Sequence, residues 1–522
     1  MAWVPVRLLA CFSALRSSVE NRKQLLTRWA LPAALVLLSG GLAGCGSGST
    51  VGTGGGGGGG GSTAVTLMVS SAANDALSRF SLFLNTLTLT SQSGKTVNLL
   101  TTPQQVEFTH LNGNPEPLLN LSVPQDVYTS ATATVGAASF TCLVQNNGSD
   151  TTDTYAYGYT PDDQVTVNLP ATVRVQGGAM ALQLELEVSQ SASFPTTCTS
   201  IGIWPYTITP TFDLTEMQLA AQPTNSTNGR LTAVEGLVSA AGAGGNSFTL
   251  TAPDGTNAFE ISTSGQVVNS ANWNWPVSTN SNTVFQGVGN AAGLAVGMPV
   301  DMDGALQSDG SVLATRVAVL DTNTTELTVN TGPLMFVSDA VPSLYDANRQ
   351  FEGSEQLMDG WLAYDFSNTA FAVWGGLTNT ATLPFGAAFD SSNMVAGQMV
   401  SLTTHVTQPG EGTSSYVPAA TMTLMPQTID ATVNGVTAQG NFTVYTVTLA
   451  PYDTFPQFAV QGGQTTLLGN PQQVIVYADS NTQMLNSSAV TAGSVVRLTG
   501  VVFNDGGTLR MDCTQLLDGV AE

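Results

Sequence analysis

One short segment built around a glycine recurs three times in this chain and constrains its fold more than any other feature. Gly297, Gly397 and Gly493 lie about 100 residues apart; each follows Ala or Val and precedes a short apolar stretch. A turn rich in Gly, Asp, Asn or Pro and a second apolar stretch come next. Glycine suits a bend at the start of a strand, and Asp-Gly suits tight hairpins. The spacing therefore predicts three copies of one β-domain, at residues 229–321, 325–426 and 428–520.

The beginning of each copy predicts a hairpin. Gly236 with the segment 247–250 matches Gly435 with the segment 441–444, while the middle copy is more diverged at its start. The pattern resembles the small β-barrel domains, similar to OB-folds, of a family of unknown function found in bacterial lipoproteins. The resemblance implies a closed barrel, and closure would remove exposed sheet edges from a domain of this size.

Residues 64–222 predict a separate β-domain ahead of the repeats. Leu182, Leu184 and Leu186 alternate with polar residues, which marks a strand with one buried face. Residues 91–95 predict a turn between two strands, and only the segment 74–80 hints at a helix. With the segment 121–128, the hairpin resembles transthyretin-like or carboxypeptidase-regulatory-like domains, which implies a β-sandwich. The expected fold class is therefore all-β: a sandwich followed by three tandem barrels.

The N-terminus predicts an export signal over residues 1–44. Arg22, Lys23 and Arg28 precede an apolar run, Trp29–Leu38, which is too short to span a bilayer that needs roughly 20 residues. The following Leu42-Ala43-Gly44-Cys45 resembles the lipobox of bacterial lipoproteins. The resemblance implies cleavage before Cys45 and lipid on its thiol; the alternative is a plain secretory signal with an incidental cysteine.

Residues 45–63 predict a flexible tether, because Gly54–Gly61 is an unbroken glycine run without side chains that could pack. In proteobacterial lipoproteins an Asp after the lipidated Cys favours the inner membrane. This chain has Gly46 there, which resembles an outer-membrane address. We therefore expect the folded part to be held in the cell envelope, on the periplasmic face or the cell surface.

Charge excludes one class of partner. The formal net charge is −23, with 13 Lys and Arg against 36 Asp and Glu, and the predicted signal removes more basic than acidic residues. Phosphate backbones are bound by clustered Lys and Arg, so we expect no nucleic-acid partner and no polybasic membrane contact. The expected partners are the membrane, through the lipid, and a glycan or an envelope protein.

Export also permits a disulfide. Cys142 and Cys198 fall within the predicted sandwich and are expected to pair. Cys513 would then be an unpaired thiol, buried in a strand.

No catalytic or metal-binding motif emerges from the sequence. His110 and His405 lack a His, Cys or acidic partner at ligand spacing, which argues against a zinc site or a His-based triad. The run from Asp301 to Asp309 resembles a calcium loop, but its twelfth position is Val312 instead of the required acid, so a hairpin is favoured. We expect a non-enzymatic protein without metal or cofactor.

Tryptophans supply the candidate ligand-binding residues: Trp273, Trp275, Trp361 and Trp374. They lie in the variable middles of the first two repeats, where exposed rings could stack on sugars or anchor a protein; alternatively, they cap the end of a barrel. The expected function is binding of glycan or protein through loops. The alternatives are a structural or spacer role in an envelope assembly and, less favoured, a carboxylate-based polysaccharide hydrolase.

Overall fold

The chain is all-β, as its alternating sequence predicts, and its one α-helix among the described residues is the single turn α1 (Val188–Ser191). The computed structural model describes residues 61–72, 77–100, 102–108, 111, 115–144, 152–156, 163–191, 208–217, 230–242, 244–251, 274–307, 311–325, 327–337, 343–346, 362–376, 380–395, 397–405, 417–450, 472–485 and 489–518. Within these ranges no helix has the length and apolar character to cross a bilayer. Residues 60–522 form one compact unit.

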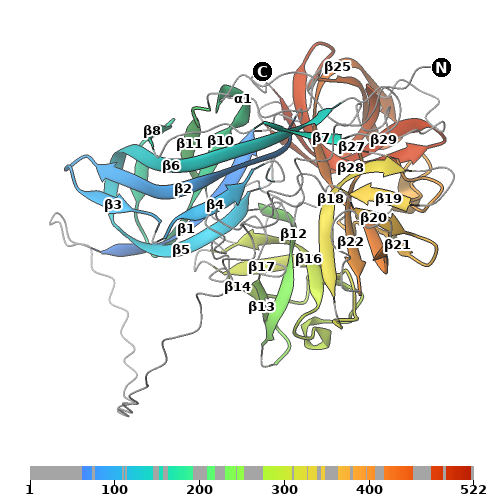
Figure 1. Ribbon diagram of the computed structural model, residues 1–522, viewed down its shortest axis with the longest axis horizontal. Coiled ribbons are helices and arrows are strands. Elements are labelled where there is room, and N and C mark those ends of the chain that lie inside the picture. The colour runs from blue at the N-terminus through green and yellow to red at the C-terminus, as the bar shows by residue number, and fades with distance from the viewer. Residues whose placement is uncertain are drawn as a thin grey trace, which may run out of the picture. The chain divides into compact units, whose positions relative to one another are not determined.

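The first domain is built on one sheet that spans residues 62–217 (Figure 1). Its strand order is β3-β2-β6-β8-β11-β10-β1-β5, with β4 added to β2, and β7 and β9 added to β6. The strands are β1 (Ser62–Ala72), β2 (Leu77–Ser91), β3 (Thr96–Asn98), β4 (Gln104–Glu107), β5 (Glu116–Pro124), β6 (Asp126–Val144), β7 (Thr152–Ala156), β8 (Asp163–Asn168), β9 (Val173–Val175), β10 (Ala179–Glu187) and β11 (Phe212–Met217).

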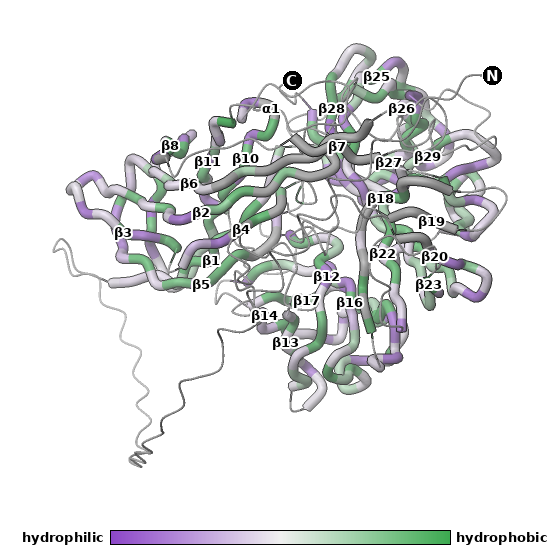
Figure 2. The backbone as a smooth tube through the Cα atoms, viewed as in Figure 1, coloured by the Kyte–Doolittle hydropathy of each residue, from purple (hydrophilic) through white to green (hydrophobic). Residues whose placement is uncertain are grey.

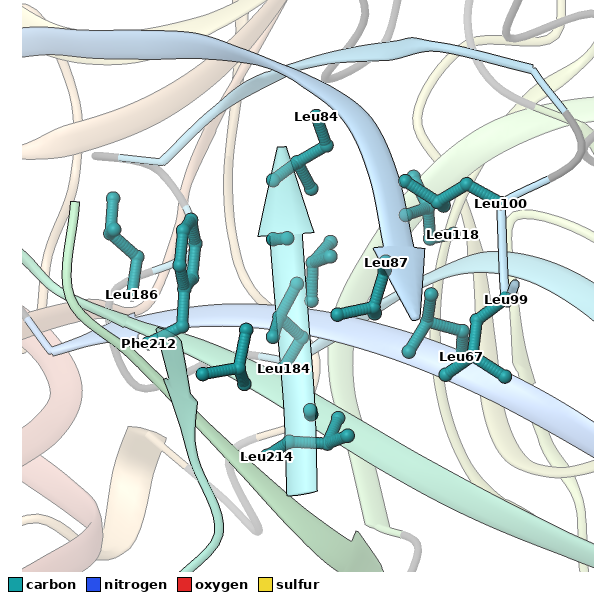
Figure 3. Close-up of a cluster of buried hydrophobic side chains, with 14 of the residues drawn as sticks. Leu67, Leu84, Leu87, Leu99, Leu100, Leu118, Leu184, Leu186, Phe212 and Leu214 are labelled. Carbon is teal, nitrogen blue, oxygen red and sulfur yellow. The ribbon is translucent and has the colours of Figure 1, made fainter. Parts of the chain in front are cut away.

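This sheet folds into a sandwich around a single core. Its two halves are joined where β8 pairs with β11 over only two residue pairs. Leu84 and Leu87 of one half and Leu184 of the other belong to the same buried cluster, which Figure 3 shows in close-up. The alternation of leucines along β10 therefore marks a core-facing side, as predicted.

The helix suggested by the segment 74–80 is wrong where the structure describes it. Residues 77–80 open β2, and 74–76 lie outside the described residues. Phe80, Leu82 and Leu84 are all buried, which is the period of a strand with one face on the core.

The first barrel spans residues 230–319. Its strands are β12 (Arg230–Ala241), β13 (Ser247–Thr251), β14 (Asn274–Ser278), β15 (Val284–Gln286), β16 (Pro299–Leu306) and β17 (Val312–Val319), with the 3-10 turn η4 (Ala291–Gly293) before β16. The strand order is β14-β13-β12-β16-β17-β15, and β14 also pairs with β17, which closes the sheet. Hydrophobic and hydrophilic residues alternate along these strands (Figure 2).

The second barrel spans residues 328–424. Its elements are β18 (Thr328–Val337), β19 (Ser343–Asp346), β20 (Leu362–Asp365), β21 (Ala370–Val373), the 3-10 turn η6 (Thr380–Thr382), β22 (Met399–Thr404), β23 (Val417–Pro418) and β24 (Thr421–Leu424). The order is β21-β24-β22-β18-β19-β20-β23, and the short strands β23 and β24 follow each other along the chain.

The third barrel is closed and contains β25 (Gln427–Gln439), β26 (Phe442–Leu449), β27 (Gln473–Leu485), β28 (Val495–Asp505) and β29 (Thr508–Asp518), in the order β25-β26-β27-β29-β28. Counted within the repeat, this order is 1-2-3-5-4-1, with the third and fifth strands parallel. The first barrel follows the same order when β15, an added strand on β17, is not counted. The second follows it when β21, an added strand on β24, is not counted and β23 and β24 count as one fifth strand. The predicted repeat is therefore one topology used three times.

The repeated glycine makes the predicted bend in every copy. Gly297, Gly397 and Gly493 have φ of 88°, 96° and 92°, a left-handed conformation that favours glycine. Each lies just before the fourth strand of its barrel. Their amides donate to the carbonyls of Val238, Leu334 and Val433, at 2.8, 2.6 and 2.8 Å. These three contacts establish which first-strand residues are equivalent.

The same contacts correct the predicted alignment of the first hairpins. Because Val238 and Val433 are equivalent, Gly236 corresponds to Ala431 and not to Gly435. A Cβ on Gly236 would lie 2.5 Å from the carbonyl oxygen of Thr251, so this position needs glycine for a different, local reason.

Candidate functional site

Charged side chains on the outer faces of the barrels are buried, which a barrel alone does not explain. Val300 and Met302 belong to the first core, so Asp301 between them points outward; yet it is 0% exposed. In the third barrel, Arg497 lies between the core residues Val496 and Leu498 and is only 7% exposed. Because successive side chains of a strand point to opposite faces, another part of the chain must cover both groups.

These residues occupy one equivalent position in the repeat. At this position a residue of the first strand pairs with a residue of the fourth strand. The first-strand member lies three residues before Val238, Leu334 or Val433, whose carbonyls accept from the repeated glycines. The pairs are Glu235 with Asp301, Thr331 with Ser401, and Asp430 with Arg497. All six are buried, so this face is covered in every copy.

In the first barrel the acids hold an arginine. Arg316 of β17 donates from Nη2 to Asp301 Oδ2 and from Nε to Asp303 Oδ2, each at 2.6 Å. Asp303 also accepts from the backbone amide of Ala233 at 2.8 Å, at a bulge where Ala233 has φ of 53°. Two aspartates of the same barrel therefore fix the orientation of the Arg316 guanidinium.

The second barrel supplies the cover. The Thr331 hydroxyl donates to Glu235 Oε2 at 2.5 Å and lies 3.0 Å from Ser401 Oγ. The Trp374 ring lies under Arg316, with 5.1 Å between the guanidinium carbon and the ring centroid, a cation–π distance. We name this set the first junction: Glu235, Asp301, Asp303, Arg316, Thr331, Ser401 and Trp374.

Burial shifts the protonation of the first junction. Desolvation raises the pKa of Asp301 to about 7; Arg316 opposes the shift, and the negative charges of Asp303 and Glu235 add to it. For Arg316, burial lowers the pKa, but the two aspartates outweigh it and the pKa rises above its usual value. Arg316 is therefore charged at any working pH, and Asp301 exchanges its proton near neutrality.

The third barrel meets the first domain through an analogous arrangement. Arg497 Nε donates to Asp430 Oδ1 at 2.9 Å and Arg497 Nη2 to Asp430 Oδ2 at 3.3 Å. Burial raises the pKa of Glu185 of β10 to about 7; Glu187 and Asp213 add to the shift and Arg497 opposes it. We name this set the second junction: Glu185, Glu187, Asp213, Asp430 and Arg497.

The second and third barrels are joined by aromatic contacts. The Phe385 ring lies 4.8 Å from Tyr477 and 5.7 Å from Phe503, measured between centroids. Arg510 lies over both Phe385 and Tyr477. Gln398 Nε2 donates to the carbonyl of Val502 at 2.8 Å, so polar and apolar contacts both hold these barrels together.

Two of the four candidate ligand-binding tryptophans are not exposed, and that expectation is wrong for them. Trp275 is 1% exposed and belongs to the core of the first barrel, because β14 continues through it. Trp374 is 2% exposed and belongs to the core of the second barrel and to the first junction. Neither ring can stack on a sugar from solvent. Trp273 and Trp361 lie outside the described residues.

Of the cysteines and histidines singled out in the sequence, some lie outside the described residues and others can be placed. Cys45, His110 and Cys198 lie outside the described residues, as does the side chain of Cys142 in β6, so the disulfide stays a prediction. Cys513 is confirmed as a free, buried thiol in β29. Burial raises its pKa well above the usual range, which makes it a poor nucleophile.

His405 has an acidic partner that sequence spacing did not reveal. Its Nε2 lies 2.9 Å from Asp321 Oδ2 and its Nδ1 3.0 Å from the carbonyl of Thr325. Asp321 also accepts from the Thr403 hydroxyl at 2.7 Å. This contact ties the chain segment between the first two barrels to the second barrel.

The acids that resemble a calcium loop are used differently. Asp301 and Asp303 lie in β16 and bind Arg316, which agrees with the predicted strand and hairpin. Across the described ranges, no group of three or more His, Cys, Asp or Glu side chains could hold a metal ion.

Sequence reasoning did not single out Glu235, Arg316, Asp430 or Arg497. One signal was present: each is a charged residue at an outward position of a β-strand, in a chain with only 9% charged residues. The usual interpretation of such a residue is solvent exposure, and only the covering domain overturns it.

Comparison with known proteins identifies one segment. Residues 235–318 match the model of a domain of unknown function, DUF5666. The match runs from β12 through β17 and so covers the first barrel, including Glu235, Asp301 and Arg316. It agrees with the expected β-domain of unknown function. No curated protein matches the chain.

Proposed function

We propose that this chain is a non-catalytic lipoprotein of the bacterial cell envelope, whose sandwich and three barrels form a rigid structural body on a flexible tether. The proposal places lipid on Cys45 and the body at the outer membrane. It favours the structural role over binding through tryptophan-bearing loops, because Trp275 and Trp374 are buried.

The observation that carries this proposal is the contact of Arg316 with Trp374. The charged group comes from the first barrel and the ring from the second, and both are buried. Separation of the two barrels would break this contact and expose both groups to water. A chain that places its scarce charges between domains uses them to hold orientation, which suits a spacer or scaffold.

The N-terminal sequence supports the location. A lipid chain contributes about 0.8 kcal/mol per buried methylene, and two or more chains give stable anchoring. The glycine run Gly54–Gly61 would separate the body from the bilayer.

Two measurements test the proposal on the full chain. Metabolic labelling with a palmitate analogue should label the wild-type protein in the membrane fraction, and Cys45→Ser should lose both label and membrane association. Cross-linking in intact cells should then recover one envelope protein at a fixed ratio to the chain. An unlabelled wild-type protein refutes the anchor, and the lack of any fixed partner refutes the structural role.

Binding of glycan or protein is the second candidate, favoured by one observation. Trp273 is the residue before β14 and Trp361 the residue before β20, so each directly precedes the third strand of its barrel. A glycan array with wild type and with Trp273→Ala/Trp361→Ala tests it. Equal or absent binding by both proteins refutes this role.

A further inference from the structure

Some buried polar atoms of the first junction lack a hydrogen-bond partner in the protein. Among the residues that the structure describes, Arg316 Nη1, Trp374 Nε1 and Asp301 Oδ1 are enclosed in this way. Arg316, Trp374 and Asp301 are 4%, 2% and 0% exposed, so bulk solvent does not reach these atoms. A buried polar atom without a partner costs free energy, and nearly all such atoms in proteins bond to another protein group or to an ordered water.

The three atoms lie in one small region. Arg316 Nη2 donates to Asp301 Oδ2 at 2.6 Å. Because Nη1 and Nη2 share one carbon atom, and Oδ1 and Oδ2 share another, this bond also places Nη1 near Oδ1. The guanidinium carbon of Arg316 lies 5.1 Å from the ring centroid of Trp374, and Nε1 is part of the same indole. Two of the atoms therefore come from the first barrel and one from the second.

The guanidinium is not free to turn toward a different partner. Arg316 Nε donates to Asp303 Oδ2 at 2.6 Å, and Nη2 is held by Asp301 at the same distance. These two bonds occupy one side and one end of the planar group. Nη1 therefore keeps its position, and any partner must come to it.

The chemistry of the three atoms fits one molecule of water. The N–H groups of Arg316 and Trp374 only donate, so they cannot satisfy each other, whereas a carboxylate oxygen of Asp301 accepts. Water accepts from two donors and donates to an acceptor at once. A buried water typically makes about three hydrogen bonds to groups that would otherwise be unsatisfied.

We propose that the first junction binds one buried water molecule, which accepts from Arg316 Nη1 and Trp374 Nε1 and donates to Asp301 Oδ1. Since Trp374 belongs to the second barrel, this water bridges the two barrels. It acts beside the direct bond from the Thr331 hydroxyl to Glu235. A bridging water is enthalpically almost equivalent to a direct hydrogen bond, so it helps to hold the two barrels in one orientation.

A crystal structure of the full chain, at a resolution that shows ordered water, tests the proposal. The expected result is a density peak at about 2.7–3.2 Å from each of the three atoms. A protein group at that position overturns the proposal. A direct bond between Trp374 Nε1 and Asp301 overturns it too, as does the lack of density there.

Two variants separate a bridging water from solvent that merely fills a gap. Trp374→Phe keeps a ring against Arg316 but removes the indole N–H. Ser401→Ala is the matched control, because it removes a junction hydroxyl that takes no part in the proposed bridge. The peak should disappear in Trp374→Phe and stay in Ser401→Ala. A peak that stays in Trp374→Phe, or one that disappears in Ser401→Ala, overturns the bridge; if either variant does not fold, the wild-type density decides.

Discussion

The first and third barrels share a strand order and the same glycine-to-carbonyl contact, yet they carry opposite charges at one equivalent outward position, Asp301 in the first and Arg497 in the third. The inward neighbours are apolar in both barrels. The comparison shows that the inward residues specify the barrel, whereas the outward residues match whatever covers them.

The covers explain the difference. The described residues of the second barrel bring hydroxyls and an aromatic ring to the first, and the arginine at this contact, Arg316, comes from the first barrel itself. The sandwich brings the carboxyl groups of Glu185 and Glu187 to the third barrel, and the positive charge of Arg497, at the equivalent position, attracts them. In the second barrel the equivalent pair is neutral, Thr331 with Ser401, and the Thr331 hydroxyl donates to Glu235 of the first barrel.

Removal of the two arginines gives the largest expected effect and separates the two junctions. Arg316→Met leaves the buried Asp301 and the partly buried Asp303 without their cation and should destabilise β16 by about 3–5 kcal/mol. Arg497→Met takes the cation from the buried Asp430 and should weaken β28. Hydrogen exchange at β16 and β28 measures both; a loss of protection at β28 in Arg316→Met, or at β16 in Arg497→Met, would contradict the comparison.

Substitution of the bulge glycines that the first and third barrels share should have the second-largest effect. Gly304 and Gly500 both lie at bulges of the fourth strand, and a Cβ would come within 2.9 Å of the Leu313 carbonyl oxygen and 2.2 Å of the Asp512 carbonyl oxygen. We expect Ala at either to cost about 1–3 kcal/mol of unfolding free energy, because the strands must move apart. Gly435→Ala is the control: no atom lies within 4 Å of its Cβ position, and it should be nearly neutral.

The second junction should respond to pH through Glu185. Because burial raises the pKa of Glu185 to about 7, stability is highest in acid and falls as pH rises toward that value. Exchange at β10 and β28 should increase about tenfold from about pH 6 to pH 8, a response that Glu185→Gln removes and Asp301→Asn leaves intact. A response in β28 that follows Asp301 would show that the junctions are not independent.

Exposed valines should show the smallest effect. Val284 of the first barrel and Val436 of the third are 55% and 39% exposed. Thr at either position keeps the branched shape and should change the unfolding free energy by less than about 0.5 kcal/mol. Thermal unfolding of the full chain measures this, and a clear loss at one site would reveal a contact that the comparison omits.

Some features were predictable because they depend on neighbours along the chain. Leu182, Leu184 and Leu186 marked a core-facing strand through their alternation, and the repeated glycines marked a bend through their spacing. The predicted alignment of the hairpins was wrong because it matched two glycines in different environments. A Cβ on Gly236 would collide with the Thr251 carbonyl oxygen, whereas a Cβ on Gly435 would meet open space.

The candidate site could not be predicted to the same depth. Trp275 and Trp374 were predicted to bind ligands because they lie in variable segments. An aromatic residue in such a segment can lie either at the surface or in the core. Their burial depends on strands that lie far away in the sequence. Arg316 and Glu235 gave no motif, since their partners are set by sheet register and by another domain.

By itself the sequence determined an all-β chain, three copies of one barrel, and the core-facing leucines of β10 in the first domain. The reason is that side-chain alternation and glycine conformation are local properties. Only the tertiary structure decided which outward faces are covered and which charges meet there. Such a contact joins residues as far apart as Glu235 and Thr331, separated by 96 positions, and its energy depends on removal of both from water.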